Sequence, residues 1–150
     1  MSEATEEPKA HVARVQELLE AVCVELRRRG RDHDRSKLLS PEVEVFEEFT
    51  GKLRGCTYGS EEYRGYLEAM RPALVHHYRE NEHHPEHFAF GVADMSLLVL
   101  IEMFCDWKAA SERHADGDLV RSIEVNTPRF GITKQVVQIL KATASGMRGW

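Results

Sequence analysis

The chain has 150 residues, of which 42% are hydrophobic, and its formal net charge is −5. This length and apolar fraction predict one domain with one core. The excess of acidic residues argues against binding to duplex nucleic acid, which requires an electropositive surface. A small anionic ligand remains compatible with the composition, because a bound metal ion reverses the sign of the local field.

The cysteines and the apolar runs indicate a cytoplasmic protein. Cys23, Cys56 and Cys105 are widely spaced and form no CxxC pair, which argues against a zinc ribbon or a redox motif and fits a reducing compartment. Residues 1–9 are polar and acidic, unlike a signal peptide. The most apolar run, residues 95–105, is too short to span a membrane. We therefore expect a soluble cytoplasmic protein with no membrane partner.

The first part of the chain shows helical periodicity. Apolar residues at steps of three and four predict a helix over residues 9–29, with His11 on its apolar stripe and Gly30 as the stop signal. Ser40-Pro41-Glu42 is typical of a helix start, with Ser as the N-cap, Pro at the first position and an acid in the first turn. The expected inward face of that helix carries Val43, Phe46, Phe49 and Leu53.

A second helical stripe starts at Ser60, which is a typical N-cap. Pro72 should kink this helix or split it in two. The stripe continues inward to His77 and Asn81, whereas His76 should point away from it. Its apolar members are Tyr63, Leu67, Met70 and Leu74.

The last third predicts two further helices. Residues 83–91 read as a turn or a short irregular helix. Asp94 should cap a strongly apolar helix over residues 95–113, residues 114–131 should be mostly loop, and Thr133 should open the last helix.

No strand-like alternation is visible, so we predict an all-α protein. The expected architecture is a compact single-domain helical bundle of about five to six helices. It should cover residues 9–146, preceded by a disordered or frayed segment over residues 1–8 and followed by a tail over residues 147–150.

Acidic and imidazole side chains fall on several of the inward stripes. His33-Asp34 follows the expected helix stop, and an adjacent His and Asp can chelate one cation, although such a pair is also common in solvated turns. Asp106 lies within the apolar helix, and Glu102 lies one turn before it on the same face. Two like-charged carboxylates repel, and each is costly to bury, which favours burial against Arg, Lys or a metal ion.

A histidine cluster follows the same logic. His77 is predicted to point inward, Asn81 follows one turn later, and His83-His84 lies just beyond the helix end. A single inward histidine is more often a hydrogen-bonded core residue than a ligand. Paired histidines before a proline can nevertheless address two metal sites or brace each other.

Taken in order, His11, His33-Asp34, His77 with His83-His84, and Asp106 resemble the signature of the HD-domain metal-dependent phosphohydrolases. The segment from His33 to Lys37 is similar to the HD-x-x-K form of that signature. Asn-Glu-His-His-Pro-Glu at residues 81–86 and Ile-Glu-Met-Phe-Cys-Asp-Trp at residues 101–107 are also similar to a small uncharacterised HD-like family of phages and bacteria. The resemblance implies a helical bundle of the HD-domain type around one or two divalent ions.

The resemblance also implies roles for individual residues. Metal-activated water would attack a small phosphorylated substrate, a nucleotide or another phosphomonoester or phosphodiester. Imidazole and carboxylate ligands suit Mn, Fe, Co, Ni or Zn. Lys37 and Glu102 would be catalytic, Lys37 by stabilising phosphate charge and Glu102 by orienting a histidine or moving a proton. The implied metal ligands are His11, His33, Asp34, His77, His83, His84 and Asp106. The implied substrate-binding residues are Arg35, Lys37, Asn81, Lys108 and Arg129.

Three other interpretations remain open. The metal could only hold helices together, in which case its coordination would be closed rather than open to water. Some nucleotidase members of the superfamily have a catalytic Glu three residues after the doublet Asp, where this chain has Lys37, so the protein could bind a nucleotide without hydrolysing it. Finally, the chain could be a plain helical interaction module with coincidental histidines.

Overall fold

The computed structural model describes residues 3–57, 60–113 and 117–147. Seven α-helices and three short 3-10 helices occur there, and no strand is present among these residues, which confirms the all-α prediction with one helix more than expected. The chain divides into two units, Met1–His33 and Asp34–Trp150. The boundary therefore falls inside the His33-Asp34 doublet.

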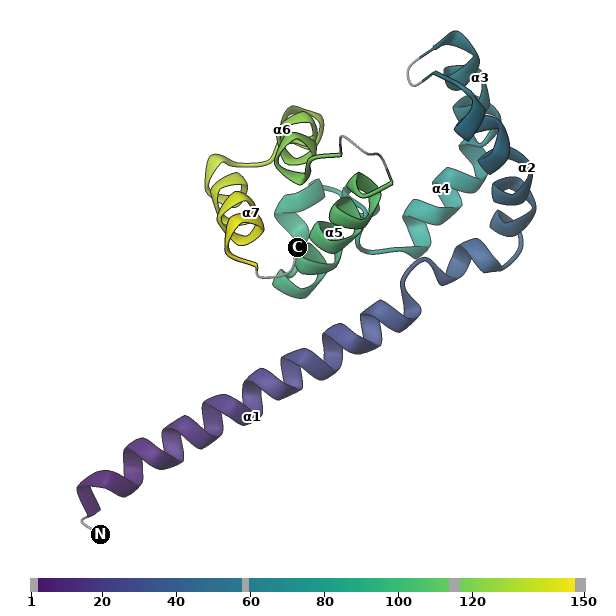
Figure 1. Cartoon of the computed structure of the whole chain (residues 1–150). Helices are drawn as coiled ribbons and strands as arrows, with labels where there is room; N and C mark the ends of the chain where they lie inside the picture. The colour runs from purple at the N-terminus through teal and green to yellow at the C-terminus, as the bar shows by residue number, and fades with distance from the viewer. Residues whose placement is uncertain (1–2, 58–59, 114–116, 148–150) are drawn as a thin grey trace. The chain divides into compact units, whose positions relative to one another are not determined.

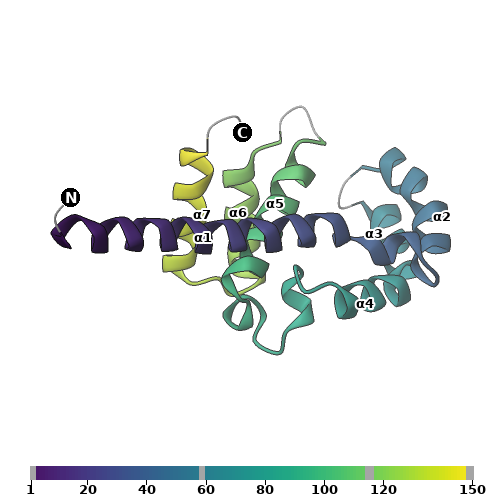
Figure 2. The same ribbon diagram turned by 90° about the horizontal axis from the view of Figure 1, so that it is seen from below.

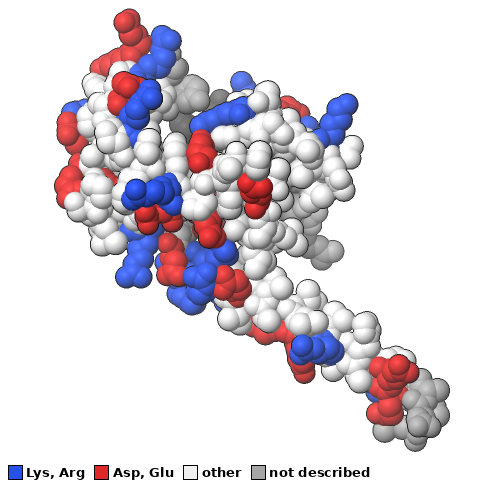
Figure 3. All heavy atoms as spheres, turned by 180° about the vertical axis from the view of Figure 1, so that it is seen from behind, with Lys and Arg blue, Asp and Glu red and all other residues white. Residues whose placement is uncertain are grey.

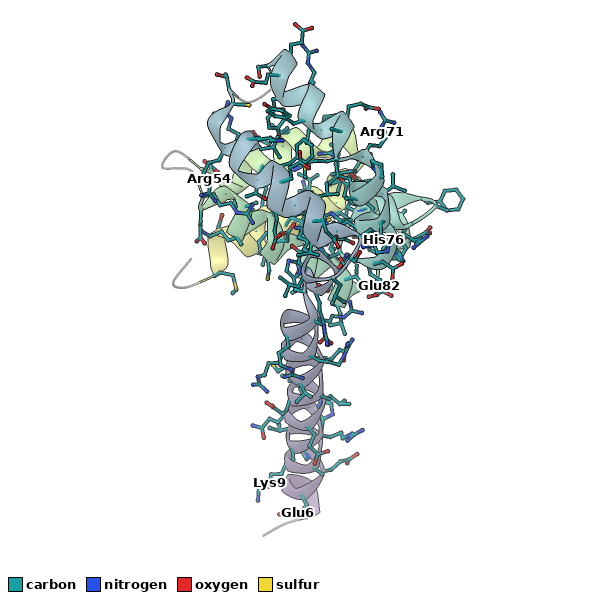
Figure 4. All side chains as sticks on the ribbon, turned by 90° about the vertical axis from the view of Figure 1, so that its right-hand side faces the viewer. Glu6, Lys9, Arg54, Arg71, His76 and Glu82 are labelled. Carbon is teal, nitrogen blue, oxygen red and sulfur yellow. The ribbon has the colours of Figure 1, made fainter. Side chains whose placement is uncertain are left out.

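The first unit consists of one continuous helix, α1 (Glu3–Asp32) (Figure 1). This helix begins before residue 9 and does not stop at Gly30. Arg28 forms ion pairs with Glu25 at 2.7 Å and with Asp32 at 3.1 Å, and such pairs one turn apart support helix on both sides of a glycine. Near the other end of α1, Glu6 and Lys9 form a similar pair at 3.2 Å (Figure 4).

The second unit begins with η1 (Arg35–Leu38) and α2 (Glu42–Gly55), which pack against each other and against α4 (Arg71–Glu80). The expected start of α2 was wrong in detail. Pro41 is the N-cap, and no side-chain cap bond forms there. Glu42 lies in the first turn as expected, and it is fully buried. This acid is buried because histidines of α4 occupy both of its oxygens.

The predicted split at Pro72 is confirmed. Helix α3 (Glu61–Ala69) is capped by Ser60, whose side chain accepts a hydrogen bond from the Tyr63 amide. Helix α4 (Arg71–Glu80) starts directly after Met70. The inward stripe is also confirmed, since His77 is 1% exposed and Asn81 is 8% exposed.

The segment after α4 contains two short 3-10 helices, η2 (Pro85–His87) and η3 (Gly91–Asp94), as the turn prediction indicated. Helix α5 (Leu97–Ser111) is capped by Ser96, whose side chain accepts a hydrogen bond from the Val99 amide. Asp94 was the wrong cap, because its Oδ2 instead accepts from the Phe90 amide at 3.0 Å and closes the η3 turn.

The prediction of loop over residues 114–131 was wrong. Helix α6 (Leu119–Arg129) occupies most of this stretch, since the Asp118 side chain accepts hydrogen bonds from two amides of the first turn. Thr133 caps α7 (Lys134–Gly146), as predicted. Figures 1 and 2 show α5, α6 and α7 side by side, and α6 packs against both neighbours. Residues 148–150 of the expected tail lie outside the described residues.

The apolar core of the second unit lies among α5, α6, α7 and η3. Its buried members are Val92, Met103, Phe104, Leu119, Ile123, Ile132 and Leu140. On the face shown in Figure 3, basic and acidic side chains are interspersed. In the part of the chain that the structure describes, no helix combines the length and apolarity needed to cross a membrane.

Shortening a buried side chain of α6 should destabilise the second unit. Ile123 is 0% exposed, so Ile123→Ala should lower the free energy of unfolding by about 2–5 kcal/mol, because it removes packed methyl groups and leaves a cavity. Val125 of the same helix is 63% exposed, and Val125→Ala should change the free energy by less than about 0.5 kcal/mol. Urea denaturation measures both, and equal effects would contradict this description of the core.

Candidate metal centre

Four of the predicted ligands converge within the second unit. One ligand atom from each of Asp34, His77, His83 and His84 lies within 4.8 Å of the other three. Asp34 Oδ1 is 3.3 Å from the Nε2 atoms of both His77 and His83, and the Nε2 atoms of His77 and His84 are 2.9 Å apart. Ligand atoms around a tetrahedral ion with bonds of 2.0–2.1 Å are about 3.4 Å apart. The spacing therefore suits a small divalent ion.

Three elements bring these four side chains together. Asp34 is the N-cap of η1 and has a left-handed backbone with φ of 55°, a conformation that Asp tolerates better than most residues. His77 projects from the buried face of α4. His83 and His84 lie in the turn between α4 and η2, where the His84 amide donates to the Asn81 carbonyl at 3.2 Å. The short turn thus returns the chain toward His77.

A polar network holds the far side of the His77 ring. Glu42 Oε2 lies 2.9 Å from His77 Nδ1 and accepts a hydrogen bond from the Ser36 hydroxyl at 2.9 Å. Asn81 donates from its amide nitrogen to Ser36 Oγ at 2.7 Å and to the His77 carbonyl at 2.8 Å. The network fixes the position of the His77 ring from behind.

Helix α5 brings two more carboxylates to the histidines. Glu102 Oε1 is 3.4 Å from His83 Nδ1, on the opposite ring edge from the Nε2 that faces Asp34. The charge of Asp106 acts on His84 and raises its pKa against the effect of burial. Several carboxylates therefore lie at this centre, and a divalent cation would offset their negative charge.

Electrostatics keeps the ligands in the forms that bind metal. Burial would raise the pKa of Asp34, but the neighbouring His77 and His83 rings and the Lys37 ammonium outweigh it and hold that pKa well below its usual range. For His84, burial and the neighbouring His83 and His77 lower the pKa to about 3. Near neutral pH, Asp34 is therefore a carboxylate and His84 a neutral imidazole.

The donor set fits a first-row transition metal or zinc. Three imidazole nitrogens and one carboxylate oxygen match the ligands that these ions prefer, whereas calcium and magnesium favour oxygen alone. If one ion were bound here, Asp34, His77, His83 and His84 would hold it, with Glu102 behind His83 and Glu42 behind His77.

The basic residues that were expected to bind substrate have different surroundings. Lys37 Nζ is 2.6 Å from Asp34 Oδ2 and 5.3 Å from the centre of the Phe46 ring, so the ammonium lies directly beside the cluster. Arg35 is exposed on η1. Lys108 forms an ion pair with Glu112 one turn along α5 at 2.5 Å.

Arg129 lies near Tyr78, whose ring packs against His84 of the cluster. It pairs with Glu86 Oε1 at 3.0 Å and lies over the Phe130 ring, 4.6 Å from its centre. It also hydrogen-bonds to Tyr78, whose ring centre is 5.0 Å from that of His84. Burial and the Glu86 charge raise the pKa of Tyr78, while Arg129 opposes that rise.

The other predicted site residues have different positions. Asn81, expected to bind substrate, has its amide engaged with Ser36 and His77. His11 lies on the exposed surface of α1, and His33 ends the first unit, so their roles as ligands stay predictions.

Sequence reasoning missed Glu42, Ser36, His76 and Tyr78. His76 was wrongly expected to point away from the interior: its Nδ1 lies 2.7 Å from Glu42 Oε1, and its side chain is 27% exposed (Figure 4). The sequence signal available for Glu42 was its place beside Pro41, which indicated only a helix start. Its pairing with α4 is a long-range contact that periodicity does not reveal.

Metal content provides a direct test of the cluster. Protein purified without a histidine tag should bind one equivalent of Co²⁺, Mn²⁺ or Zn²⁺ at the four-ligand cluster, and Asp34→Asn or His77→Ala should weaken that binding strongly, because each removes a ligand. His87 is exposed and outside the cluster, so His87→Ala should leave it unchanged. Equilibrium dialysis with elemental analysis measures the stoichiometry. Equal metal content in all four proteins would refute the assignment.

The low pKa of His84 predicts a pH dependence of stability in metal-free protein. Between its ordinary value of 6.5 and the folded value of about 3, the unfolded chain binds a proton that the folded chain does not. The free energy of unfolding should therefore fall as the pH is lowered from 6.5 to 5, by up to about 1.4 kcal/mol per pH unit from this group. His84→Asn should reduce that slope in urea titrations with a chelator present. An identical slope in the variant would show that His84 is protonated in the folded state.

Comparison with known proteins identifies the family of the chain. No curated protein and no solved structure matches it. One family model matches residues 1–146, and its description is "Family of unknown function (DUF5662)". Because the match covers nearly the whole sequence, the chain belongs to the DUF5662 family.

Proposed function

We propose that the protein is a metal-dependent phosphohydrolase that acts on a small phosphorylated substrate, either a nucleotide or another phosphomonoester or phosphodiester. The observation that carries this proposal is the convergence of Asp34, His77, His83 and His84. The Lys37 ammonium contacts the Oδ2 oxygen of Asp34 beside this cluster. An ion and an ammonium side by side form an electrophilic site that suits phosphate oxygens. The ordered resemblance to HD-domain phosphohydrolases supports the same reading.

The Lys37 ammonium is placed to act on both protein and substrate. Its contact with Asp34 Oδ2 leaves Oδ1 directed at His77 and His83, so a single carboxylate can serve a metal with one oxygen and Lys37 with the other. A side chain that is 33% exposed can also meet an incoming anion. Lys37 would thus neutralise charge that develops on the phosphate oxygens.

A bound ion would supply a nucleophile from water at neutral pH and polarise the phosphoryl group. Glu102 would keep the His83 ring in register through its contact with Nδ1, because that contact fixes which nitrogen carries the proton. Two roles were expected for Glu102, orienting a histidine or moving a proton. The contact with His83 favours the first.

Tyr78 and Arg129 offer a second polar edge on the His84 side. The Tyr78 ring packs against His84, and Arg129 bonds to Tyr78 while its side chain remains 58% exposed. A substrate with a second anionic or polar group could contact Arg129 there, which agrees with a nucleotide or a diester. We place the activity in the cytoplasm, where the three free cysteines would stay reduced.

Turnover and its dependence on Lys37 test this proposal. With Mn²⁺ or Co²⁺ present, the protein should hydrolyse members of a panel of nucleotides and p-nitrophenyl phosphate esters. Lys37→Met should lower kcat by about 100-fold while metal remains bound, because a charge stabiliser of the reaction is lost.

Lys141→Met is the matched control. Lys141 pairs with Glu124 on α6, away from the cluster, so its replacement should leave turnover unchanged. A protein that binds the ion with full stoichiometry but hydrolyses no phosphate ester would instead hold a structural metal, and the phosphohydrolase proposal would fail.

A further inference from the structure

We propose that Glu42 is a positioning residue that sets the tautomer of His77 and thereby makes its Nε2 a metal ligand. The inference rests on the metal centre of the proposed function. It extends that proposal to a residue of another helix that does not itself enter the ligand cluster.

The contacts of His77 assign its proton. An ionised carboxylate only accepts hydrogen bonds, and Glu42 Oε2 lies 2.9 Å from His77 Nδ1. Glu42 Oε2 accepts a hydrogen bond from the Ser36 hydroxyl and Oε1 faces His76 Nδ1, so its surroundings favour the ionised carboxylate. A proton of His77 therefore lies on Nδ1, and Nε2 is the nitrogen that faces Asp34 Oδ1 and His84 Nε2.

Glu42 itself is fixed in place. It is 0% exposed, and a buried carboxylate is tolerated only when its oxygens are satisfied. Oε1 lies 2.7 Å from His76 Nδ1, and Oε2 accepts from Ser36 as well as His77. Both oxygens are thus committed, and the carboxylate cannot turn away from His77 without losing another partner.

The Glu42 carboxylate matters because hydrogen-bond donors of other residues lie close to the same nitrogen of His77. The amide nitrogen of Asn81 lies 3.0 Å from the same His77 Nδ1. The two hydrogens of this NH₂ group go to Ser36 Oγ and the His77 carbonyl, and the Ser36 hydroxyl lies 3.2 Å from Nδ1. Without a carboxylate there, the Ser36 hydroxyl would lose its acceptor and donate to Nδ1, which favours the tautomer in which Nε2 carries the proton. That Nε2–H would point at Asp34 Oδ1, only 3.3 Å away, and would take the place of the ion. Glu42 therefore decides between a metal-binding and a hydrogen-bonding His77.

Glu42→Gln separates this role from simple packing, because the side chain keeps its shape but gains an amide donor. In long-range ¹H–¹⁵N spectra of metal-free protein labelled at histidine, wild-type His77 should show the Nδ1–H tautomer, and the variant should shift to Nε2–H. Co²⁺ affinity, followed by visible absorption, should fall by about 10–100-fold.

Glu44→Gln is the matched control, since Glu44 lies in the same first turn of α2 but is exposed. It should change neither spectrum nor affinity. Wild-type protein with His77 as the Nε2–H tautomer would overturn the inference even if Glu42→Gln failed to fold. So would a folded Glu42→Gln variant with wild-type tautomer and affinity. If wild type bound no Co²⁺ while the tautomer still shifted in the variant, the inference about Glu42 would stand and the proposed function would fail.

Discussion

The Asp34 carboxylate is the charge on which the polar interior of the second unit depends. One oxygen faces the Nε2 atoms of His77 and His83 at 3.3 Å, and the other contacts Lys37 at 2.6 Å. A carboxylate withdrawn from water is unfavourable unless donors or cations surround it. These contacts hold the pKa of Asp34 low in spite of burial, so η1, α4 and the turn after α4 are tied to a single negative charge.

The polar cluster and the apolar core share one helix. Met103 and Phe104 place one side of α5 in the core with α6 and α7, while Glu102 on the adjoining side contacts His83. Packing against α6 therefore also fixes where the Glu102 carboxylate lies. A side chain supported in this way keeps its position through apolar burial, which does not depend on a bound ion.

Much of this arrangement follows from local sequence signals. Four-residue spacing from Met70 through Leu74 placed His77 and Asn81 on the buried face of α4, and Pro72 marked the break before it. Ser60 and Thr133 were recognised as caps because a short hydroxyl side chain satisfies a free amide at a helix start. The convergence of Asp34 with three histidines agrees with the pattern that their order suggested.

The misread parts depend on contacts that local patterns do not encode. Helix α6 is short, contains Pro128 and follows a polar stretch, and these features are typical of a loop. Its two buried residues, Leu119 and Ile123, form too short an apolar stripe to indicate a helix against them. Gly30 read as a stop, but charged pairs around it continue the helix. Glu42 was recognised only as the acid of a helix start, because helix starts favour acids for reasons unrelated to tertiary structure. Its burial against the histidines of α4 was not predicted.

The orientation of the His77 ring depends on a chain of contacts that passes through the buried Glu42 carboxylate. His76 Nδ1 and the Ser36 hydroxyl contact Glu42 and fix its position. Glu42 in turn orients the His77 ring, which presents Nε2 to Asp34. The bonds to Glu42 are hydrogen bonds to a charged group, which are stronger than bonds between neutral groups. The His77 ring is therefore held in its orientation by contacts within the protein alone. A ligand that is already oriented loses little conformational freedom on binding, so a large share of the affinity at this centre would originate in α2, an element that supplies no ligand.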